Sequence, residues 1–241
     1  ARTDPEAALA WARRLPEGDE RAQGLLGVAF QRVSEQPVES LRIAAELPPS
    51  RSRDELVAVA ASEWGARDPA SATTWARSIP EEWMRDQTLA SIATAWAGTE
   101  PAQAARLAVE EVSAGKAQND AIVSIVQQWT ALNPAEAGAW LTGFPEGELR
   151  DTSLGEFVKA WADLDLEQAG RWVGEAALTG SSRDAALAAY TTKALAQSPA
   201  QAVPWANQIQ NESLRMRQLE VIAENWMTSD PAAGQIGRAH V

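Results

Sequence analysis

Apolar residues recur along the chain with the spacing of one helix face. In segment 89–96 they stand at four positions: Leu89, Ile92, Ala93 and Trp96. The offsets i, i+3, i+4 and i+7 bring these side chains onto one side of an α-helix. The same offsets return in three later segments: 122–129, 154–161 and 219–226. The pattern therefore predicts a series of amphipathic helices that each bury one face.

Between these segments lies a second kind of helix, which a proline introduces. Proline, replaced once by leucine, recurs every 32 or 33 residues: Pro5, Pro37, Pro69, Pro101, Pro134, Leu166, Pro199 and Pro231. The preceding residue is most often Asp, Asn or Ser, whose side-chain oxygen accepts a free backbone N–H of the first turn. Proline suits the next position because its missing N–H would have no partner there. The period therefore predicts repeated two-helix hairpins.

Small and aromatic residues hold fixed places in each hairpin. With the proline counted as position one, position four is Ala or Ser and position seven is most often Trp. Another Trp often stands eleven residues earlier, at the end of the preceding hairpin, which creates three pairs: Trp64 with Trp75, Trp129 with Trp140, and Trp161 with Trp172. We expect these pairs to pack across the turn between consecutive hairpins. One hairpin cannot bury such stripes alone, so neighbouring hairpins must stack.

The repeat predicts an all-α fold, a right-handed α-solenoid of seven hairpins of 32–33 residues and a truncated eighth. The hairpins start near residues 4, 36, 68, 100, 133, 165, 198 and 230, so residues 1–234 form one array. Residues 235–241 break the pattern, because position seven of the eighth hairpin is Gly237. Their sequence, QIGRAHV, matches one reading frame of a common short-read sequencing adapter. We interpret residues 235–241 as an unstructured translation of that adapter, and the chain as a fragment of a longer bacterial, metagenomic protein.

The amino-acid composition excludes several classes of function. The formal net charge is −12, which argues against a nucleic-acid partner, because such proteins gather Lys and Arg against phosphates. There is no cysteine, and the only histidine, His240, lies in the adapter-like tail. Thiol or histidine catalysis and the usual zinc ligands are therefore not expected, and we predict no catalytic residue, no metal ligand and no cofactor. No apolar run approaches the ~18 residues of a membrane span. The compartment, cytoplasmic or periplasmic, stays open.

Acidic residues form the remaining candidate for catalysis. Four local clusters stand out: Glu81 with Glu82, Glu110 with Glu111, Glu146 with Glu148, and Asp163 with Asp165. A pair of carboxylates can hydrolyse a glycosidic bond, and a closed α/α-toroid can carry such a pair. The alternative interpretation is structural, because acids at turns and first helical turns are well solvated and favoured by the helix dipole.

Two groups of residues are candidates for binding a partner. Trp83 is the one tryptophan outside the repeated positions, and it falls in the turn between the two helices of its hairpin. It is either an exposed contact for a partner or a local cap on the apolar end of the hairpin. Position six of alternate first helices carries an arginine: Arg42, Arg106 and Arg171. These arginines either face an acidic peptide or form an ordinary solvated surface.

The segment from Asp68 to Trp75, with Pro69 and Ala72 between them, reads DP-x-x-A-x-x-W. With its relatives along the chain, it resembles the tetratricopeptide-like superhelices over residues 1–234. The repeat period of 32–33 residues differs from the 34 residues of a tetratricopeptide repeat, and the W-x2-L-G-x2-Y signature of that repeat is absent. The motif is closer to the DP-x-x-A-x-x-W helical repeat proteins of environmental bacteria.

The expected function is that of a non-catalytic scaffold that binds a protein or peptide partner, because solenoids present long surfaces of this kind. Two alternatives stay open. One is a carbohydrate-active α/α-toroid enzyme with a carboxylate pair, and the other is the ectodomain of a membrane-anchored regulator.

Overall fold

The computed structural model describes residues 5–229, and every regular element among them is an α-helix. The predicted all-α fold is therefore confirmed. The start of the eighth hairpin at residue 230 and the tail at 235–241 lie outside the described residues. The chain divides into two compact units, residues 1–125 and 126–241, with the division inside helix α8 (Lys116–Leu132).

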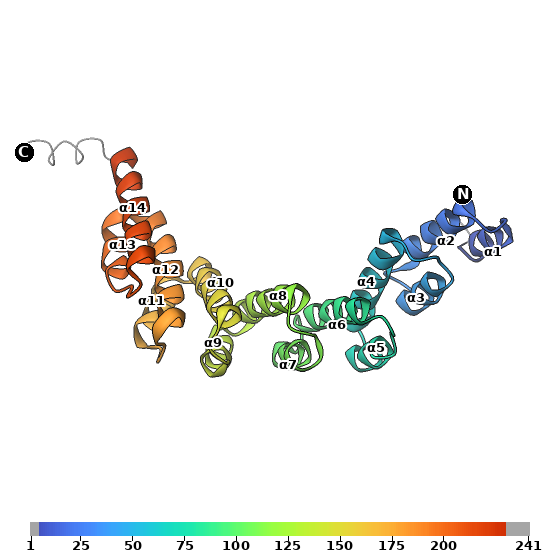
Figure 1. Cartoon of the computed structure of the whole chain (residues 1–241), viewed down its shortest axis with the longest axis horizontal. Helices are drawn as coiled ribbons and strands as arrows, with labels where there is room; N and C mark the ends of the chain where they lie inside the picture. The colour runs from blue at the N-terminus through green and yellow to red at the C-terminus, as the bar shows by residue number, and fades with distance from the viewer. Residues whose placement is uncertain (1–4, 230–241) are drawn as a thin grey trace, which may run out of the picture. The chain divides into compact units, whose positions relative to one another are not determined.

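The N-terminal unit is built from alternating short and long helices. Its helices, besides the first part of α8, are α1 (Pro5–Arg14), α2 (Asp19–Arg32), α3 (Pro37–Ala45), α4 (Arg51–Gly65), α5 (Pro69–Ala76), α6 (Glu82–Trp96) and α7 (Pro101–Glu111). Each helix from α1 to α6 packs on the next one in the chain, and the second helices of the hairpins also pack on each other, α2 on α4 and α4 on α6. The first helices α3, α5 and α7 make no close backbone contact with one another. In Figure 1 the second helices of this unit lie side by side, with α3, α5 and α7 along one flank.

The C-terminal unit repeats this arrangement. After the rest of α8 it contains α9 (Pro134–Gly143), α10 (Glu148–Leu164), α11 (Leu166–Glu175), α12 (Gly180–Gln197), α13 (Pro199–Ala206) and α14 (Glu212–Ser229). Consecutive helices from α9 to α14 pack on each other, and the second helices again form their own contacts, α10 with α12 and α12 with α14.

The helix starts lie where the proline repeat predicts them. Within the described residues, six first helices begin at the repeated position with the residue before it as N-cap. Four of these caps accept the backbone N–H three residues on: Asp68, Asn133, Asp165 and Ser198. Gln36 and Glu100 make no such bond, because their longer side chains suit an N-cap poorly.

The predicted tryptophan pairs are present in both units. The ring centroids of Trp64 and Trp75 are 6.2 Å apart. The centroid distance is 5.8 Å for Trp129 with Trp140 and 6.2 Å for Trp161 with Trp172. All three pairs are tilted, an arrangement that aromatic rings prefer over face-to-face stacking. Each pair joins the end of one hairpin to the middle of the next first helix, as the sequence predicts.

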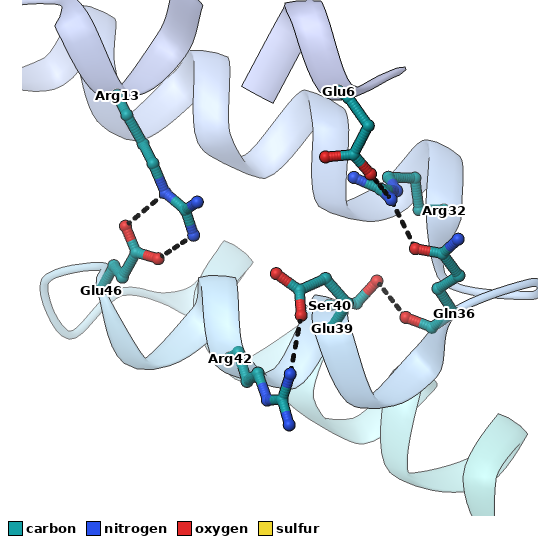
Figure 2. A network of polar contacts seen from close by, with 8 residues as sticks. All are labelled: Glu6, Arg13, Arg32, Gln36, Glu39, Ser40, Arg42 and Glu46. Carbon is teal, nitrogen blue, oxygen red and sulfur yellow. Dashed lines mark hydrogen bonds and ion pairs between the residues drawn. The ribbon is translucent and has the colours of Figure 1, made fainter. Parts of the chain in front are cut away.

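One hairpin junction uses an ion pair in place of aromatic rings. Arg32 occupies the repeat position of Trp64, and its side chain is only 8 % exposed. Figure 2 shows its guanidinium between the carboxylate of Glu6 and the side-chain oxygen of Gln36, to both of which it donates hydrogen bonds. A buried arginine needs such partners, because an unpaired buried charge is costly. The same figure shows Arg13 of α1 bound through two nitrogens to Glu46 at the end of α3.

Three of the repeated arginines near the starts of second helices bind back to their own hairpins. Arg85, Arg150 and Arg215 donate to the carbonyl oxygens of Ile79, Thr142 and Ile209, at 3.2, 3.0 and 2.7 Å. These acceptors stand at or just beyond the C-terminal ends of the first helices, whose last carbonyls lack intrahelical partners. Gln118 holds the same repeat position and donates to the carbonyls of Ala108, Val109 and Val112.

The aspartate that follows this arginine reaches forward to the next hairpin. Asp151 accepts a hydrogen bond from the hydroxyl of Ser182 at 2.6 Å. Asp184, which is 5 % exposed, accepts from the backbone N–H groups of Gln210 and Asn211, both at 2.8 Å. The Arg150–Asp151 dipeptide thus ties its own hairpin together and fastens the next one.

Two glycines allow close approach of helices in the C-terminal unit. A Cβ atom on Gly138 would lie 2.9 Å from Cζ of Phe157 and 2.9 Å from Nε1 of Trp172. A Cβ atom on Gly170 would collide with the hydroxyl of Tyr190, which donates to the carbonyl of Leu166 at 3.1 Å. At position five of these two first helices there is therefore no room for a Cβ atom, so only glycine fits.

We expect Gly170→Ala to lower the free energy of unfolding by about 1–3 kcal/mol, because the added methyl group overpacks the contact with Tyr190. Gly155→Ala is the matched control, since Gly155 lies inside α10 and a Cβ atom there meets nothing within 4 Å. That control should raise the free energy of unfolding by up to ~1 kcal/mol through helix propensity. Urea denaturation of both variants measures the two effects, and equal signs would contradict the packing argument.

The role of the repeated arginine gives a second prediction. Arg150→Leu should lower the free energy of unfolding by about 1–3 kcal/mol, because the carbonyl of Thr142 loses its buried partner. Arg150→Gln should recover part of this loss, since Gln118 forms the equivalent bonds in the preceding hairpin. Urea midpoints of the two variants test this order, and equal losses would show that only the packing of the arginine stem matters.

Candidate functional site

The acidic clusters serve mainly as structural partners. Glu111 binds Arg77, Asp163 binds Lys193, and Glu82 accepts a hydrogen bond from Ser113. Asp165 caps α11, and its pKa is lowered, chiefly because it accepts a hydrogen bond from the backbone N–H of Gln168. These contacts agree with the structural interpretation of the acids.

The part of the chain that the structure describes contains no cluster of three or more His, Cys, Asp or Glu side chains able to hold a metal ion. Among the same residues, no helix has the length and apolar character needed to cross a bilayer.

Trp83 lies in the first turn of α6 with 56 % of its surface exposed. Its indole therefore does not close the apolar end of the hairpin in the way that a buried cap would. Its use as a contact for a partner stays a prediction.

The three predicted arginines differ in their surroundings. Arg42 turns toward Glu39 on its own helix at 3.2 Å, as Figure 2 shows, and 73 % of its side chain is exposed. Arg171 is 3.6 Å from Glu167, also one turn away on the same helix. Arg106 makes no ion pair with any described residue, and it lines a pocket between α5 and α7. Arg42 and Arg106 belong to the N-terminal unit and Arg171 to the C-terminal one.

This first-helix pocket exists because α5 and α7 do not pack directly on each other. It has a volume of about 300 Å³. Its walls come from α5 and α7, and Trp96 at the end of α6 contributes an aromatic surface. The polar side chains along it are Thr73, Thr74, Arg77, Gln103, Arg106, Glu110 and Glu111.

An ion pair bridges the two helices beside this pocket. Arg77 donates from Nε and Nη2 to the two carboxylate oxygens of Glu111, at 2.7 and 2.5 Å. The hydrogen bond from Arg77 lowers the pKa of Glu111, and the same bond raises the pKa of Arg77. This two-point contact holds α5 and α7 at the separation that leaves the pocket between them.

A second concave surface lies along the second helices of the N-terminal unit. We call it the second-helix groove; its volume is about 480 Å³. The lining residues come from α4, α6 and the first part of α8: Ala58, Val59, Ser62, Glu63, Gln87, Ala90, Ser91, Thr94, Ala117, Asp120, Ala121 and Ser124. Most of these side chains are small, so consecutive helices leave an open channel above their outer faces.

The charged and hydroxyl side chains of the groove are partly engaged within the protein. Ser91 donates back to the carbonyl of Gln87 at 2.9 Å, which keeps its side chain against its own helix. Glu63 is 3.3 Å from Arg67, and Asp120 pairs with Lys116. The groove therefore offers a mostly apolar floor with hydroxyl, amide and carboxylate groups at its sides.

Sequence reasoning did not identify the second-helix groove. It singled out residues that break the repeat or carry a full charge, whereas Ala90, Ser91 and Ser124 look like ordinary solvent-facing positions. One feature of the sequence could have indicated the groove: short, uncharged side chains recur at the same repeat position of successive second helices, at Val59, Ser91 and Ser124.

Comparison of the chain with protein-family models, curated proteins and solved structures finds no significant match. The function must therefore be argued from the surfaces themselves.

The Arg77–Glu111 ion pair predicts a specific dependence of stability on pH. Because the folded protein lowers the pKa of Glu111, the pair stabilises the fold above the ordinary glutamate pKa of about 4.3, and this contribution disappears as the pH falls through the lowered value. Glu111→Gln should therefore be less stable than the unaltered protein at neutral pH, with a difference that shrinks in acid. Urea midpoints measured from neutral pH to about pH 3 test this.

Glu110→Gln is the matched control, because it removes the same charge one residue away, from a side chain without an ion pair to any described residue. A constant difference between Glu111→Gln and the unaltered protein at every pH would contradict the assignment.

Proposed function

We propose that this protein is a non-catalytic repeat scaffold that binds a segment of a partner protein or a peptide in the second-helix groove. In this proposal the hairpins form a right-handed α-solenoid of tetratricopeptide-like architecture, with seven hairpins and part of an eighth. The order of helix contacts supports it, because α1 to α7 and α9 to α14 each pack on their neighbours within the run, and second helices such as α4 and α6 or α10 and α12 pack on each other. Arrays built in this way present extended surfaces to partners.

The observation that carries the proposal is the continuity of the groove across three hairpins. Residues from α4, α6 and α8 line one hollow of about 480 Å³. A hollow that crosses parallel elements of three repeats suits an elongated ligand better than a small molecule, which needs an enclosed site.

The lining indicates what kind of segment fits. Small side chains such as Ala90 and Ser91 admit the backbone or the apolar side chains of a peptide close to the helix surface. Gln87 and Ser124 supply donors and acceptors for peptide groups that lose water on binding. Glu63 and Asp120 lie in the groove, and the chain carries a net charge of −12, so a segment with Lys or Arg beside its apolar residues is favoured.

Trp83 and the three arginines predicted from the sequence lie outside the groove, and in this proposal they are additional contact points. Trp83 is an exposed aromatic side chain, a residue type that often contributes strongly to protein interfaces. Arg42 and Arg171 already have carboxylate neighbours on their own helices, which leaves Arg106 as the arginine best able to take up an external anion.

Selection of a random peptide library displayed on phage against the purified protein tests the proposal. We expect enriched peptides that carry basic and apolar residues and whose affinity falls as salt rises. Ser91→Trp places an indole in the middle of the groove, and it should weaken these peptides about tenfold or more, because the added ring occupies their site.

Thr99→Trp is the matched control, since it adds the same ring at an exposed turn between α6 and α7 that lines neither concave surface described above. This control should leave peptide affinity unchanged. The proposal fails when no peptide is enriched, or when enriched peptides bind the Ser91→Trp protein as tightly as the unaltered one.

A further inference from the structure

One hairpin junction of the N-terminal unit lacks its second tryptophan. Position seven of the first helix is Trp75 in α5 but Leu107 in α7. Trp96 ends α6 at the repeat position of Trp64, yet it has no aromatic neighbour among the described residues, whereas Trp64 packs on Trp75. The smaller leucine leaves one face of the Trp96 indole without the ring that the repeat places there.

The first-helix pocket lies at this junction, where both Trp96 and Leu107 line it. Its volume of about 300 Å³ stands at the lower end of the range for ligand pockets, ~300–1,000 Å³. A ligand of the size of one amino acid fits this volume, and a ring is favoured because Trp96 offers a surface for aromatic packing.

Polar groups beside this aromatic surface are unsatisfied within the protein. The Thr73 side chain lines the pocket, the residue is only 6 % exposed, and its hydroxyl has no hydrogen-bond partner among the described residues. Such buried polar groups are normally paired, so the unpaired hydroxyl marks this wall of the pocket as incompletely satisfied within the protein.

Four charged side chains line the pocket, and they form two pairs. One pair is joined by an ion pair, and the other, which we call the open pair, is not. Arg77 and Glu111 satisfy each other through two hydrogen bonds. Arg106 and Glu110 stand one turn apart on α7, line the same pocket, and form no ion pair with each other or with other described residues. Arginine binds a carboxylate and glutamate binds an ammonium group, so the open pair matches a ligand that carries both.

We propose that the first-helix pocket binds a free aromatic α-amino acid. Its ring packs on Trp96 and Leu107, its carboxylate binds Arg106, and its ammonium group binds Glu110. This site lies on the first helices and is separate from the second-helix groove, so it stands or falls independently of the proposed peptide binding.

Isothermal titration calorimetry with L-tryptophan as the probe tests the site on the whole chain. We expect saturable binding, and affinities weaker by about tenfold for tryptamine, which lacks the carboxylate, and for indole-3-propionate, which lacks the ammonium group. L-Alanine, which lacks the ring, should not bind measurably. The proposal is overturned when L-tryptophan shows no saturable binding, or when L-alanine binds as well as L-tryptophan.

Leu107→Trp restores the missing member of the pair and fills the pocket from within. It should abolish binding of L-tryptophan while the protein keeps or raises its melting temperature, because the new ring packs on Trp96 as Trp75 packs on Trp64. Unchanged binding by this variant would overturn the proposal.

Two surface substitutions keep the test decisive if Leu107→Trp fails to fold. Arg106→Gln should reduce the affinity for L-tryptophan about tenfold and leave the affinity for tryptamine unchanged, because tryptamine has no carboxylate. Glu110→Gln should also reduce the affinity for L-tryptophan about tenfold, and it should leave the affinity for indole-3-propionate unchanged, because that ligand has no ammonium group. Equal losses for all three ligands would contradict the assigned contacts. Ser91→Trp, in the second-helix groove, is the control that should bind L-tryptophan normally.

Discussion

Burial of the two apolar stripes of each hairpin depends on the next hairpin, and the rest of the structure follows from this constraint. A first helix such as α5 is only eight residues long and cannot cover the longer helix beside it. Its tryptophan therefore packs backward on the tryptophan that ends the preceding second helix, as Trp75 does on Trp64. Aromatic rings contribute large buried areas, so the two rings at each of the three Trp–Trp junctions stabilise the contact between neighbours that the hairpin alone cannot supply.

Polar bonds set the positions that the apolar contacts leave undetermined. Arg150 and Gln118, near the starts of their second helices, close their own hairpins on the last carbonyls of the first helix. Asp151 and Asp184 bind groups of the next hairpin. Between consecutive first helices, ion pairs such as Arg13–Glu46 and Arg77–Glu111 span a gap that backbone packing does not close. The two faces of the N-terminal unit thus differ. Second helices lie close together beneath a channel of small residues, and first helices stand apart with a pocket between α5 and α7.

Polar and charged groups that could bind a ligand or a partner occur where the sequence departs from the repeat. Arg32 stands at the repeat position of a tryptophan and binds Glu6 and Gln36, so a buried arginine with polar partners takes the place of packed rings at that junction. Leu107 replaces another tryptophan and leaves Trp96 facing a pocket with an unpaired hydroxyl and two unpaired charges. A repeat that is identical at every junction would fill each of these positions with the same packed rings, and neither feature would exist.

The sequence alone determined the helical class, the helix starts and the tryptophan pairs, because caps, prolines and the 3.6-residue period act within or between neighbouring segments of the chain. The same reasoning placed Trp83 and Arg106 on the surface but did not show that Arg106 faces a pocket or that Thr73 lies unpaired beside it. It also missed the second-helix groove, since Ala90 and Ser91 carry no distinctive pattern. Only the tertiary structure decided these surfaces, because a hollow depends on the spacing and tilt of successive helices, and the repeat pattern specifies which faces meet without specifying how far apart their outer edges stand.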